Sequence, residues 1–357
     1  MNSNEVYIQR CIDLAKKGSG YVSPNPLVGC VIVKDNEVIS EGFHSAFGSP
    51  HAEADAINKY SGDLTGTTLY VNLEPCSHFG KTPPCTDLII KRGIKKVVIG
   101  HTDPNPLVDG KGVDILKSAG IEVVSGVLEE KCRELNRFFL KFHSEKRPFI
   151  TLKIAQTLDG KIADSSYASK WITGQKSRVL VHNFRSEFDA VLVGLNTVMV
   201  DNPFLDTRFV NGRNPTKIVL DKFFGISLSR NIFLSGKTIV VTSEKNSDKE
   251  SQLIALGHKV IYTQLNSDGG FDFITLLPQI AAEGIISIFV EGGSRVFSSF
   301  MRTGFYDEII LFSAPKILGS GIPALENIGV SKIEECVTLK LVEFTLLDGD
   351  ILTRYLK

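Results

Sequence analysis

Apolar positions recur along this chain with the periods of helices and strands, and the two kinds of segment alternate. In the first third, the pattern predicts a helix over residues 6–17 and a hairpin made of strands 27–33 and 38–42. Further strands are expected at 68–73, 96–100 and 121–124, and further helices at 86–92, 113–118 and 129–142. This order predicts an antiparallel hairpin that leads into a mostly parallel sheet.

A polar segment at residues 143–148 interrupts the alternation and closes with a proline. The pattern then restarts with an expected strand at 149–154. Later strands are expected at 190–193, 217–221, 238–242, 259–262 and 286–290, and helices at 175–187, 273–283 and 295–302. Because 357 residues exceed the usual size of a single core, we expect two α/β domains, at residues 1–145 and 148–357.

Charge and hydropathy narrow the classes of partner. Lys plus Arg and Asp plus Glu each number 40, so no net field attracts a polyanion and we expect no nucleic-acid partner. The chain has no apolar run of about 18 residues, and its first residues lack the basic and apolar regions of a signal peptide. The composition therefore predicts a cytoplasmic protein with no membrane partner.

One histidine and two cysteines have the composition of a catalytic zinc site. His51 opens a His-Ala-Glu triplet at the start of an expected helix, Cys76 follows a Glu-Pro pair, and Cys85 starts another expected helix. One imidazole and two thiolates leave the fourth tetrahedral position to water, whereas structural zinc sites have four protein ligands. Glu53, two residues after the histidine, would lie beside the metal and move the proton of an activated water. The sequence predicts His51, Cys76 and Cys85 as ligands and Glu53 as the catalytic residue.

The other cysteines favour a simpler interpretation. A lone cysteine is usually a small, buried apolar side chain. Cys11, Cys30, Cys132 and Cys336 stand outside any ligand spacing, and we expect all four to be buried. In a reducing compartment a metal explains the remaining cysteine pair better than a disulfide does.

The second half has one clear local feature, a strand that ends in two glycines. The expected strand at 286–290 is followed by Glu291, Gly292 and Gly293 and then by a helix. Such a turn lets backbone amides approach a phosphate at a helix N-terminus. Turns of this kind also use glycine for steric reasons alone, so the residues by themselves leave both interpretations open. The pattern is not G-x-G-x-x-G, and a standard Rossmann site does not follow.

The motifs of the two halves resemble those of a single family. Eight residues separate the two cysteines in place of the common Cys-x-x-Cys, and this spacing is similar to that of the deaminase domain of bifunctional riboflavin-biosynthesis proteins. The segments that carry the resemblance are 23–29, 51–54, 74–85 and 103–107 in the first half, and 151–155, 158–161, 169–173, 192–194, 197–203 and 291–293 in the second. It implies a cytidine-deaminase-like three-layer α/β/α domain followed by a dihydrofolate-reductase-like α/β domain that uses NADPH.

The resemblance also implies which residues line each pocket. The deaminase substrate would contact Asn25, His44, His78, Lys81, Asp103 and Asn105. The NADPH cofactor would contact Ala155, Trp171, Thr197, Asp201 and the turn formed by Gly292, Gly293, Ser294, Arg295, Val296, Phe297 and Ser298. The reductase substrate would contact Ser169, Arg185, Leu205, Arg208 and Glu291, with Lys153 as a further candidate for the reductase chemistry.

Several of these positions have a second interpretation. The two asparagines precede prolines and could simply form turns. Arg185 and Arg208 could be solvated surface charges, although guanidinium groups also match phosphate oxygens. Trp171 could be a core residue as well as a cofactor contact. Lys81 is the better candidate in its loop, since an ammonium there could meet a substrate phosphate.

The family implies a bifunctional enzyme of riboflavin biosynthesis. We expect zinc-dependent hydrolytic deamination of 2,5-diamino-6-(5-phosphoribosylamino)pyrimidin-4-one, then NADPH-dependent reduction of the ribosyl group of the resulting uracil to ribityl. The partners would be these phosphorylated pyrimidines and further copies of the chain in a homo-oligomer. Two alternatives are a deaminase of free nucleosides, bases or tRNA with a second domain for assembly, and a zinc-stabilised binding protein without catalysis.

Overall fold

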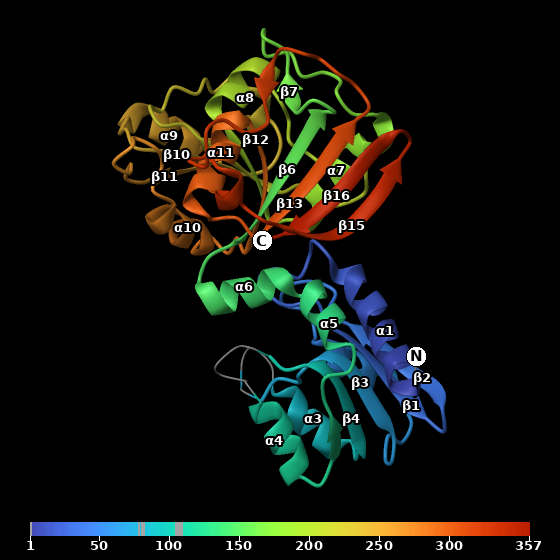
Figure 1. Ribbon diagram of the computed structural model, residues 1–357. Coiled ribbons are helices and arrows are strands. Elements are labelled where there is room, and N and C mark those ends of the chain that lie inside the picture. The colour runs from blue at the N-terminus through green and yellow to red at the C-terminus, as the bar shows by residue number, and fades with distance from the viewer. Residues whose placement is uncertain (1, 78, 80–82, 104–109) are drawn as a thin grey trace. The chain divides into compact units, whose positions relative to one another are not determined.

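The computed structural model describes residues 2–77, 79, 83–103 and 110–357. The chain forms two compact units, Met1–Lys146 and Arg147–Lys357 (Figure 1). None of the helices in the described ranges is long and apolar enough to cross a membrane.

The first unit is built on a five-stranded sheet in the order β2-β1-β3-β4-β5. Strand β1 pairs antiparallel with β2 and β3, and β3, β4 and β5 run parallel, so the expected hairpin and mostly parallel sheet are confirmed. The strands are β1 Gly29–Lys34, β2 Glu37–Phe43, β3 Thr68–Leu73, β4 Lys96–His101 and β5 Glu122–Val124. The helices are α1 Ser3–Ala15, α2 Ala52–Lys59, α3 Cys85–Lys91, α4 Lys111–Ser118, α5 Glu129–Leu135 and α6 Arg137–Glu145.

Alternate residues of β1 face two separate cores, which makes this unit three-layered. Cys30 and Ile32 pack with residues of α2, α3 and α4. Val31 and Val33 pack with residues of α1 and with Cys132 of α5. A strand whose two faces are both buried is continuously apolar, as this one is. The sheet is therefore covered by helices on each side (Figure 1).

The single helix expected over 129–142 is wrong. The structure has two helices, α5 and α6, which meet at Asn136 with backbone angles of −101° and 18°. The side chain of this residue accepts a hydrogen bond from the N–H of Leu27 at 2.8 Å and donates one to the carbonyl oxygen of Leu27 at 3.1 Å. A buried amide that satisfies a distant backbone is a tertiary constraint that helical periodicity does not reveal.

The second unit is built on a nine-stranded sheet in the order β11-β10-β9-β8-β12-β6-β13-β16-β15. Neighbours are parallel from β11 to β13 and antiparallel at β16 and β15. The strands of this sheet are β6 Phe149–Thr157, β8 Ala190–Gly194, β9 Thr216–Leu220, β10 Thr238–Thr242, β11 Lys259–Tyr262, β12 Ser287–Gly292, β13 Glu308–Ala314, β15 Lys340–Leu347 and β16 Asp350–Leu356. Strands β7 Lys161–Ala163 and β14 Ile322–Pro323 form a separate two-stranded sheet. The helices are α7 Gln175–Glu187, α8 Leu195–Asp201, α9 Ser247–Ala255, α10 Phe273–Ala281 and α11 Ser294–Thr303.

Two helices of this unit, α8 and α9, were not expected from the sequence. Each buries a single apolar side chain, Val198 in α8 and Leu253 in α9, so neither carries the repeated apolar stripe that marks an amphipathic helix.

The cysteines outside the metal motif are divided between core and surface. Cys11, Cys30 and Cys132 are buried as expected, whereas the expected burial of Cys336 is wrong because its side chain is exposed. This cysteine follows a short 3-10 turn, Ile333–Glu335, in which no residue is buried. Burial preference by residue type therefore fails where the surrounding segment has no contact with the core.

Candidate functional site

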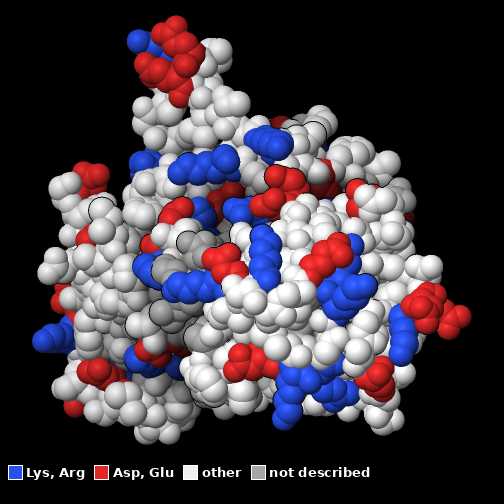
Figure 2. Space-filling model, turned by 90° about the horizontal axis from the view of Figure 1, so that it is seen from below, with Lys and Arg blue, Asp and Glu red and all other residues white. Residues whose placement is uncertain are grey.

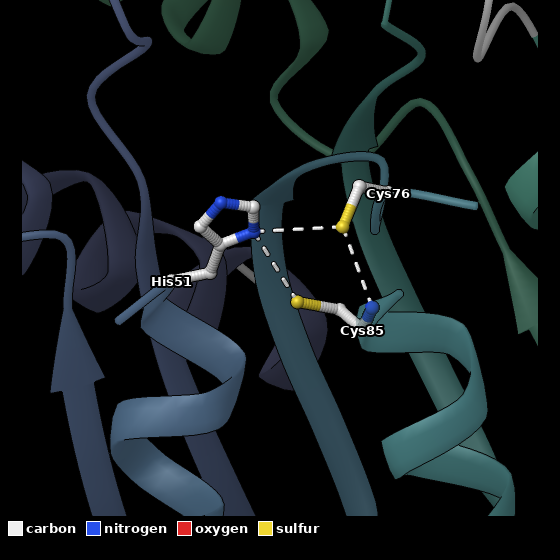
Figure 3. Close-up of side chains that lie close together, drawn as sticks. All are labelled: His51, Cys76 and Cys85. Carbon is white, nitrogen blue, oxygen red and sulfur yellow. Dashed lines mark hydrogen bonds between the residues drawn. The ribbon is translucent and has the colours of Figure 1, made fainter. Parts of the chain in front are cut away.

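Three side chains of the first unit converge in a cluster that fits a metal ion. His51 precedes α2, Cys76 lies in the loop after β3, and Cys85 opens α3 (Figure 3). Their ligand atoms all lie within 4.8 Å of one another. The Nδ1 atom of His51 is 3.5 Å from the Sγ of Cys76 and 3.4 Å from the Sγ of Cys85. The predicted ligand set is therefore assembled in space, despite the eight residues between the two cysteines.

Close packing of α2 on β2 fixes where the histidine stands. At Gly42 of β2, a Cβ atom would lie 2.5 Å from the carbonyl oxygen of Ala52 and 2.4 Å from the backbone nitrogen of Ala56. Only glycine allows the helix to approach so closely. The N-terminus of α2, with His51 and Glu53, is held against the sheet in consequence.

The electrostatics of the cluster favour a cation. The hydrogen bond with Cys76 raises the pKa of His51 to about 9. Hydrogen bonds from Cys85 and His51 lower the pKa of Cys76, even though burial opposes this. The raised pKa of His51 and the lowered pKa of Cys76 mean that a positive charge and the Cys76 thiolate stabilise each other, while the hydrogen bond with Cys76 raises the pKa of Cys85. An imidazole and two sulfur atoms within reach of one another are the donor set that zinc prefers, so the residues fit this metal.

Glu53 is 3% exposed and lies in the same cavity as the cluster. Burial raises its pKa to about 7, and the nearby Cys76 adds to the shift. The carboxyl group can therefore exist in either protonation state near neutral pH, which is the property of a general acid and base. The structure places the predicted catalytic residue beside the predicted ligands.

The cavity beside this cluster has a volume of about 370 Å³. Of the residues expected to bind the deaminase substrate, Asn25, His44 and Asp103 line it. The Nδ2 atom of Asn25 is 3.1 Å from the Nε2 atom of His44, and the Nδ1 atom of His44 is 3.0 Å from the carbonyl oxygen of Pro50. His78, Lys81 and Asn105, also expected here, lie outside the described residues.

Glu74, the glutamate of the Glu-Pro-Cys motif, organises one wall of this cavity. Its buried carboxylate accepts hydrogen bonds from the backbone N–H groups of Asp103, Gly110 and Val113, each at 3.1 Å. Three such bonds tie the segment after β4 to the loop that carries Cys76. The sequence placed this residue in a motif, and the structure shows that it holds Asp103 at the cavity.

The second unit contains a larger cavity of about 600 Å³. Strands β8, β12 and β6 are adjacent and parallel, and residues at their carboxyl ends contribute to its walls. This is the usual place for a ligand in an open α/β sheet. Eleven expected residues line it, namely Lys153, Ala155, Ser169, Trp171, Arg185, Thr197, Asp201, Leu205, Arg208, Glu291 and Phe297.

A buried charged triad lies in this second cavity. Glu291 accepts hydrogen bonds from Arg185 through both carboxylate oxygens, and the Nη2–Oε2 distance is 2.9 Å. The Nζ atom of Lys153 is 3.8 Å from the same Oε2 atom. The side chains of Arg185, Glu291 and Lys153 are only 11%, 8% and 16% exposed, so the interpretation of Arg185 as a surface charge is wrong. Burial raises the pKa of Glu291, but the charge and hydrogen bonds of Arg185 together with the charge of Lys153 outweigh it, and the net shift is downward.

The remaining polar groups stand at the rim. The Oγ atom of Ser169 donates to Asp201 at 3.3 Å. Arg208 has a side chain that is 47% exposed, pairs with Asp206 and covers the ring of Phe209 at 5.2 Å. Trp171 is 60% exposed with Arg178 over its ring at 4.5 Å, so its interpretation as a core residue is wrong.

The turn at Gly292 and Gly293 fits both the steric interpretation and the phosphate interpretation of its sequence. Both glycines have positive φ, 29° at Gly292 and 99° at Gly293. A Cβ at Gly292 would lie 2.8 Å from the ring of Phe297, so the steric interpretation holds. The Oγ atom of Ser294, at the start of α11, is nevertheless buried and has no hydrogen-bond partner among the described residues. An orphaned hydroxyl at a helix N-terminus fits a bound phosphate as well.

Other residues of this turn do not line the cavity. Arg295 has a side chain that is 89% exposed and lies 3.6 Å from Glu326. The Oγ atom of Ser298 donates to the carbonyl oxygen of Ser294 at 2.8 Å and is therefore engaged within the helix. The residues expected to bind the cofactor that do not line the cavity are Gly292, Gly293, Ser294, Arg295, Val296 and Ser298.

Several residues that line the two cavities were not predicted from the sequence. His182 and Phe209 line the second cavity with rings 4.5 Å apart, and Phe139, Phe142 and His143 of α6 line the first. None of these residues stands in a local motif. The helical spacing of the three α6 residues was the one available signal, because positions i, i+3 and i+4 share a helix face.

Neither sign of charge dominates the face of the molecule seen in Figure 2. In the view of Figure 2, basic and acidic side chains are interspersed. This agrees with the equal totals of 40 basic and 40 acidic residues.

Two family descriptions match the chain, one for each unit. The description "Cytidine and deoxycytidylate deaminase zinc-binding region" matches residues 1–101, and "RibD C-terminal domain" matches residues 148–353.

Whole-length relatives are similar to the chain. The riboflavin biosynthesis protein RibD of Aquifex aeolicus is 44% identical over 348 residues, covering 97% of this chain and 96% of that protein. The RibD of Actinobacillus pleuropneumoniae is 42% identical, covering 98% and 94%. The crystal structure of a diaminohydroxyphosphoribosylaminopyrimidine deaminase/5-amino-6-(5-phosphoribosylamino)uracil reductase from Thermotoga maritima is 42% identical with a TM-score of 0.90, covering 99% of this chain and 98% of that one. RibD of Acinetobacter baumannii is 37% identical with the same TM-score and the same coverage.

Proposed function

This chain belongs to the RibD family of bifunctional deaminase/reductases of riboflavin biosynthesis, and from that premise we propose how its two cavities divide the two reactions. The first unit would deaminate 2,5-diamino-6-(5-phosphoribosylamino)pyrimidin-4-one, and the second would reduce the ribosyl group of the resulting uracil to ribityl. The substrates are those in the name of the Thermotoga protein. The observation that carries the proposal is the presence in one chain of a His/Cys/Cys cluster beside a buried carboxylate and of a separate cavity with a buried Lys–Glu–Arg triad.

Membership of this family removes both alternative functions. The second unit matches the reductase domain, so it does more than assemble a nucleoside or tRNA deaminase. The chain is an enzyme, and a zinc-stabilised binding protein without catalysis is excluded.

In the deaminase reaction, water adds to the amine-bearing ring carbon, the carbon–nitrogen bond breaks, and ammonia leaves. His51, Cys76 and Cys85 would hold zinc, which supplies a Lewis acid that activates water when bound. Glu53 would take the proton of the attacking water and deliver protons to the ring nitrogen and to the departing amine. Its burial excludes bulk water from this transfer. Asp103 and the Asn25–His44 pair would orient the substrate.

Replacement of Cys85 tests the ligand assignment. In Cys85→Ser, a hydroxyl that stays protonated at neutral pH replaces a thiolate ligand. We expect zinc per chain, measured by mass spectrometry of the metal, to fall at least tenfold, and ammonia release to fall about a hundredfold or more. Cys336→Ser is the matched control, since it removes a thiol that is exposed and outside the cluster. Full zinc content in Cys85→Ser would remove Cys85 from the ligand set.

In the reductase reaction, a hydride adds to the anomeric carbon of the sugar, the ring carbon–oxygen bond breaks, and the ring oxygen takes a proton. NADPH would supply the hydride when bound. Lys153 would donate the proton, because it is buried at the cavity and paired with Glu291. The pKa of Lys153 is lowered by burial, which eases the transfer. Thr197, whose hydroxyl donates to the carbonyl oxygen of Gly292 at 3.0 Å, would help to fix the cofactor turn.

Replacement of Arg208 tests the phosphate end of the reductase site. The half-exposed guanidinium of Arg208 pairs with Asp206. We propose that it breaks this ion pair and binds the substrate phosphate instead, because the forked guanidinium matches phosphate oxygens. In Arg208→Ala, the Michaelis constant for the pre-deaminated substrate should rise about tenfold, from the loss of one charge-assisted hydrogen bond. Initial rates of NADPH oxidation measure this. Arg302→Ala, an exposed arginine of α11 that does not line the cavity, should leave the constant unchanged. An unchanged constant in Arg208→Ala would contradict the assignment.

The remaining assignments follow from the two reactions and the even charge. We propose one zinc ion and NADPH as cofactors, phosphorylated pyrimidines as substrates, a homo-oligomeric state, and a cytoplasmic location without nucleic-acid or membrane partners. The domains would extend over 1–145 and 148–357. Incubation with the diaminopyrimidinone, with and without NADPH, tests the function through ammonia and NADPH followed together. Ammonia should appear in both samples and NADPH should be consumed only when that substrate is present.

A further inference from the structure

Helix α6 contributes three aromatic side chains to the deaminase cavity, and the mechanism above uses none of them. Phe139, Phe142 and His143 line the same cavity as His51 and Glu53. They stand at positions i, i+3 and i+4, so one face of the helix forms this wall. Apolar groups that include Pro24, Val28 and Leu73 also line the cavity.

The wall is rigidly attached to the unit that contains the metal cluster. Asn136, immediately before α6, is 2% exposed and exchanges two hydrogen bonds with the backbone of Leu27, at 2.8 and 3.1 Å. The carbonyl oxygen of Leu27 also accepts a hydrogen bond from Asn72 of β3 at 2.9 Å. The start of the helix is thus connected through buried amides to the central sheet.

The three rings differ in role. Phe139 is only 7% exposed and packs as a core residue. The imidazole of His143 lies 4.3 Å from the ring of Phe139 at 51° and 5.4 Å from that of Phe142 at 81°. Tilted and edge-to-face contacts at these distances fix the orientation of a ring. Phe142 and His143 remain partly exposed where they line the cavity.

His143 has hydrogen-bonding capacity that the described part of the protein does not use. Among the described residues, the contacts of the ring are those with Phe139 and Phe142, and neither ring nitrogen makes a hydrogen bond. Burial lowers the pKa of His143, and the charge of Lys146 lowers it further, which favours the neutral ring. A neutral imidazole offers one donor and one acceptor at a fixed edge. This suits a flat heterocycle that carries both amino and carbonyl groups.

We propose that Phe142 and His143 bind the pyrimidine base of the deaminase substrate, Phe142 by ring contact and His143 by a hydrogen bond from its ring edge to a base or ribose heteroatom. The inference rests on the proposed deaminase function and names the part of the substrate that this wall recognises. The base is favoured over the phosphate because the described residues that line the cavity include no lysine or arginine. A phosphate requires a cation or a row of N–H donors, whereas aromatic walls bind bases.

Three variants of one helix test the proposal in the full-length, zinc-loaded protein. His143→Phe keeps an aromatic ring and removes its nitrogens, and Phe142→Leu keeps an apolar side chain and removes the ring. Phe138→Leu is the matched control, since Phe138 lies on α6 against Arg137, at 4.4 Å, and does not line the cavity. Steady-state ammonia release gives the Michaelis constant and kcat, and NADPH oxidation on pre-deaminated substrate checks that each variant is folded.

We expect the Michaelis constant for deamination to rise about tenfold in His143→Phe and about fivefold in Phe142→Leu, with kcat and the reductase rate changed less than about twofold. An unchanged Michaelis constant in both variants, or an equal rise in Phe138→Leu, overturns the proposal.

A binding measurement separates this inference from the proposed function. Calorimetry in the Glu53→Gln background gives the dissociation constant of the diaminopyrimidinone without turnover. If the wild-type protein releases no ammonia, the deaminase assignment fails. A dissociation constant that rises in His143→Phe would still support the proposed contact between His143 and the ligand. If neither His143→Phe nor Phe142→Leu alters the dissociation constant, the proposal that these side chains bind the base is wrong.

Discussion

Glu53→Gln should abolish ammonia release while the protein keeps its zinc and its reductase activity. An amide has nearly the shape of the carboxyl group, so the packing of this buried residue is retained. It cannot take a proton from water or pass one to the departing amine, and general acid–base catalysis of this kind is worth about a hundredfold to ten-thousandfold. We expect kcat for deamination to fall about a thousandfold, zinc per chain to stay unchanged, and NADPH oxidation on pre-deaminated substrate to continue at the wild-type rate.

The matched control for this variant lies two residues further along the same helix. Asp55→Asn also changes a carboxyl group into an amide, but Asp55 pairs with Lys59 at 2.6 Å and does not line the cavity. It should retain deamination. A Glu53→Gln protein that loses its zinc, or that still releases ammonia at more than about a tenth of the normal rate, would contradict the role given to Glu53.

Glu291→Gln should have the opposite effect, with reduction lost and deamination kept. Glu291 is the one anion between Arg185 and Lys153 in the triad, and its side chain is 8% exposed. Removal of its charge leaves two buried cations without compensation, which costs about 3 kcal/mol and displaces the groups at the site of hydride transfer. We expect kcat/KM for NADPH oxidation to fall about a hundredfold or more, which corresponds to that energy. Ammonia release should stay normal.

A variant of a second buried carboxylate distinguishes a loss of protein stability from a loss of the reductase reaction. Glu308 is fully buried in the same unit, pairs with Arg354, accepts a hydrogen bond from Thr151 at 2.7 Å, and does not line the cavity. Glu308→Gln should lower the melting temperature of the protein by about as much as Glu291→Gln does, and it should leave the reductase rate unchanged. Equal loss of reduction in both variants would show that Glu291 acts only through stability.

The parts of the fold that depend on local apolar patterns could be predicted from the sequence. The alternation of Cys30–Val33 between two buried faces and the continuous apolar strands of the second unit specify sheets covered by helices, and the three-layer deaminase fold and the reductase fold are confirmed. The break at Asn136 could not be predicted, because it depends on hydrogen bonds to Leu27, more than a hundred residues away in sequence. Helices α8 and α9 lack an apolar stripe and leave no periodic signal.

The metal cluster was predictable because its chemistry is encoded in short motifs. His-x-Glu and Pro-Cys restrict both residue type and spacing, and the structure brings His51, Cys76 and Cys85 together. The aromatic wall has no such signature. Phe142 and His143 fall in a segment whose polar end resembled a linker, and only the packing of α6 places them at the cavity. The buried state of Arg185 likewise depends on its contact with Glu291, far away in sequence.

We propose that one chain carries two chemically independent active sites for consecutive reactions. The most direct test of this proposal supplies the diaminopyrimidinone and NADPH to Glu53→Gln, to Glu291→Gln and to an equal mixture of the two proteins, and follows ammonia and NADPH together. We expect ammonia without NADPH oxidation from Glu291→Gln, neither ammonia nor NADPH oxidation from Glu53→Gln, and both from the mixture, because the deaminated intermediate made by one protein is reduced by the other. Failure of Glu291→Gln to release ammonia, or absence of NADPH oxidation in the mixture, would contradict the proposal.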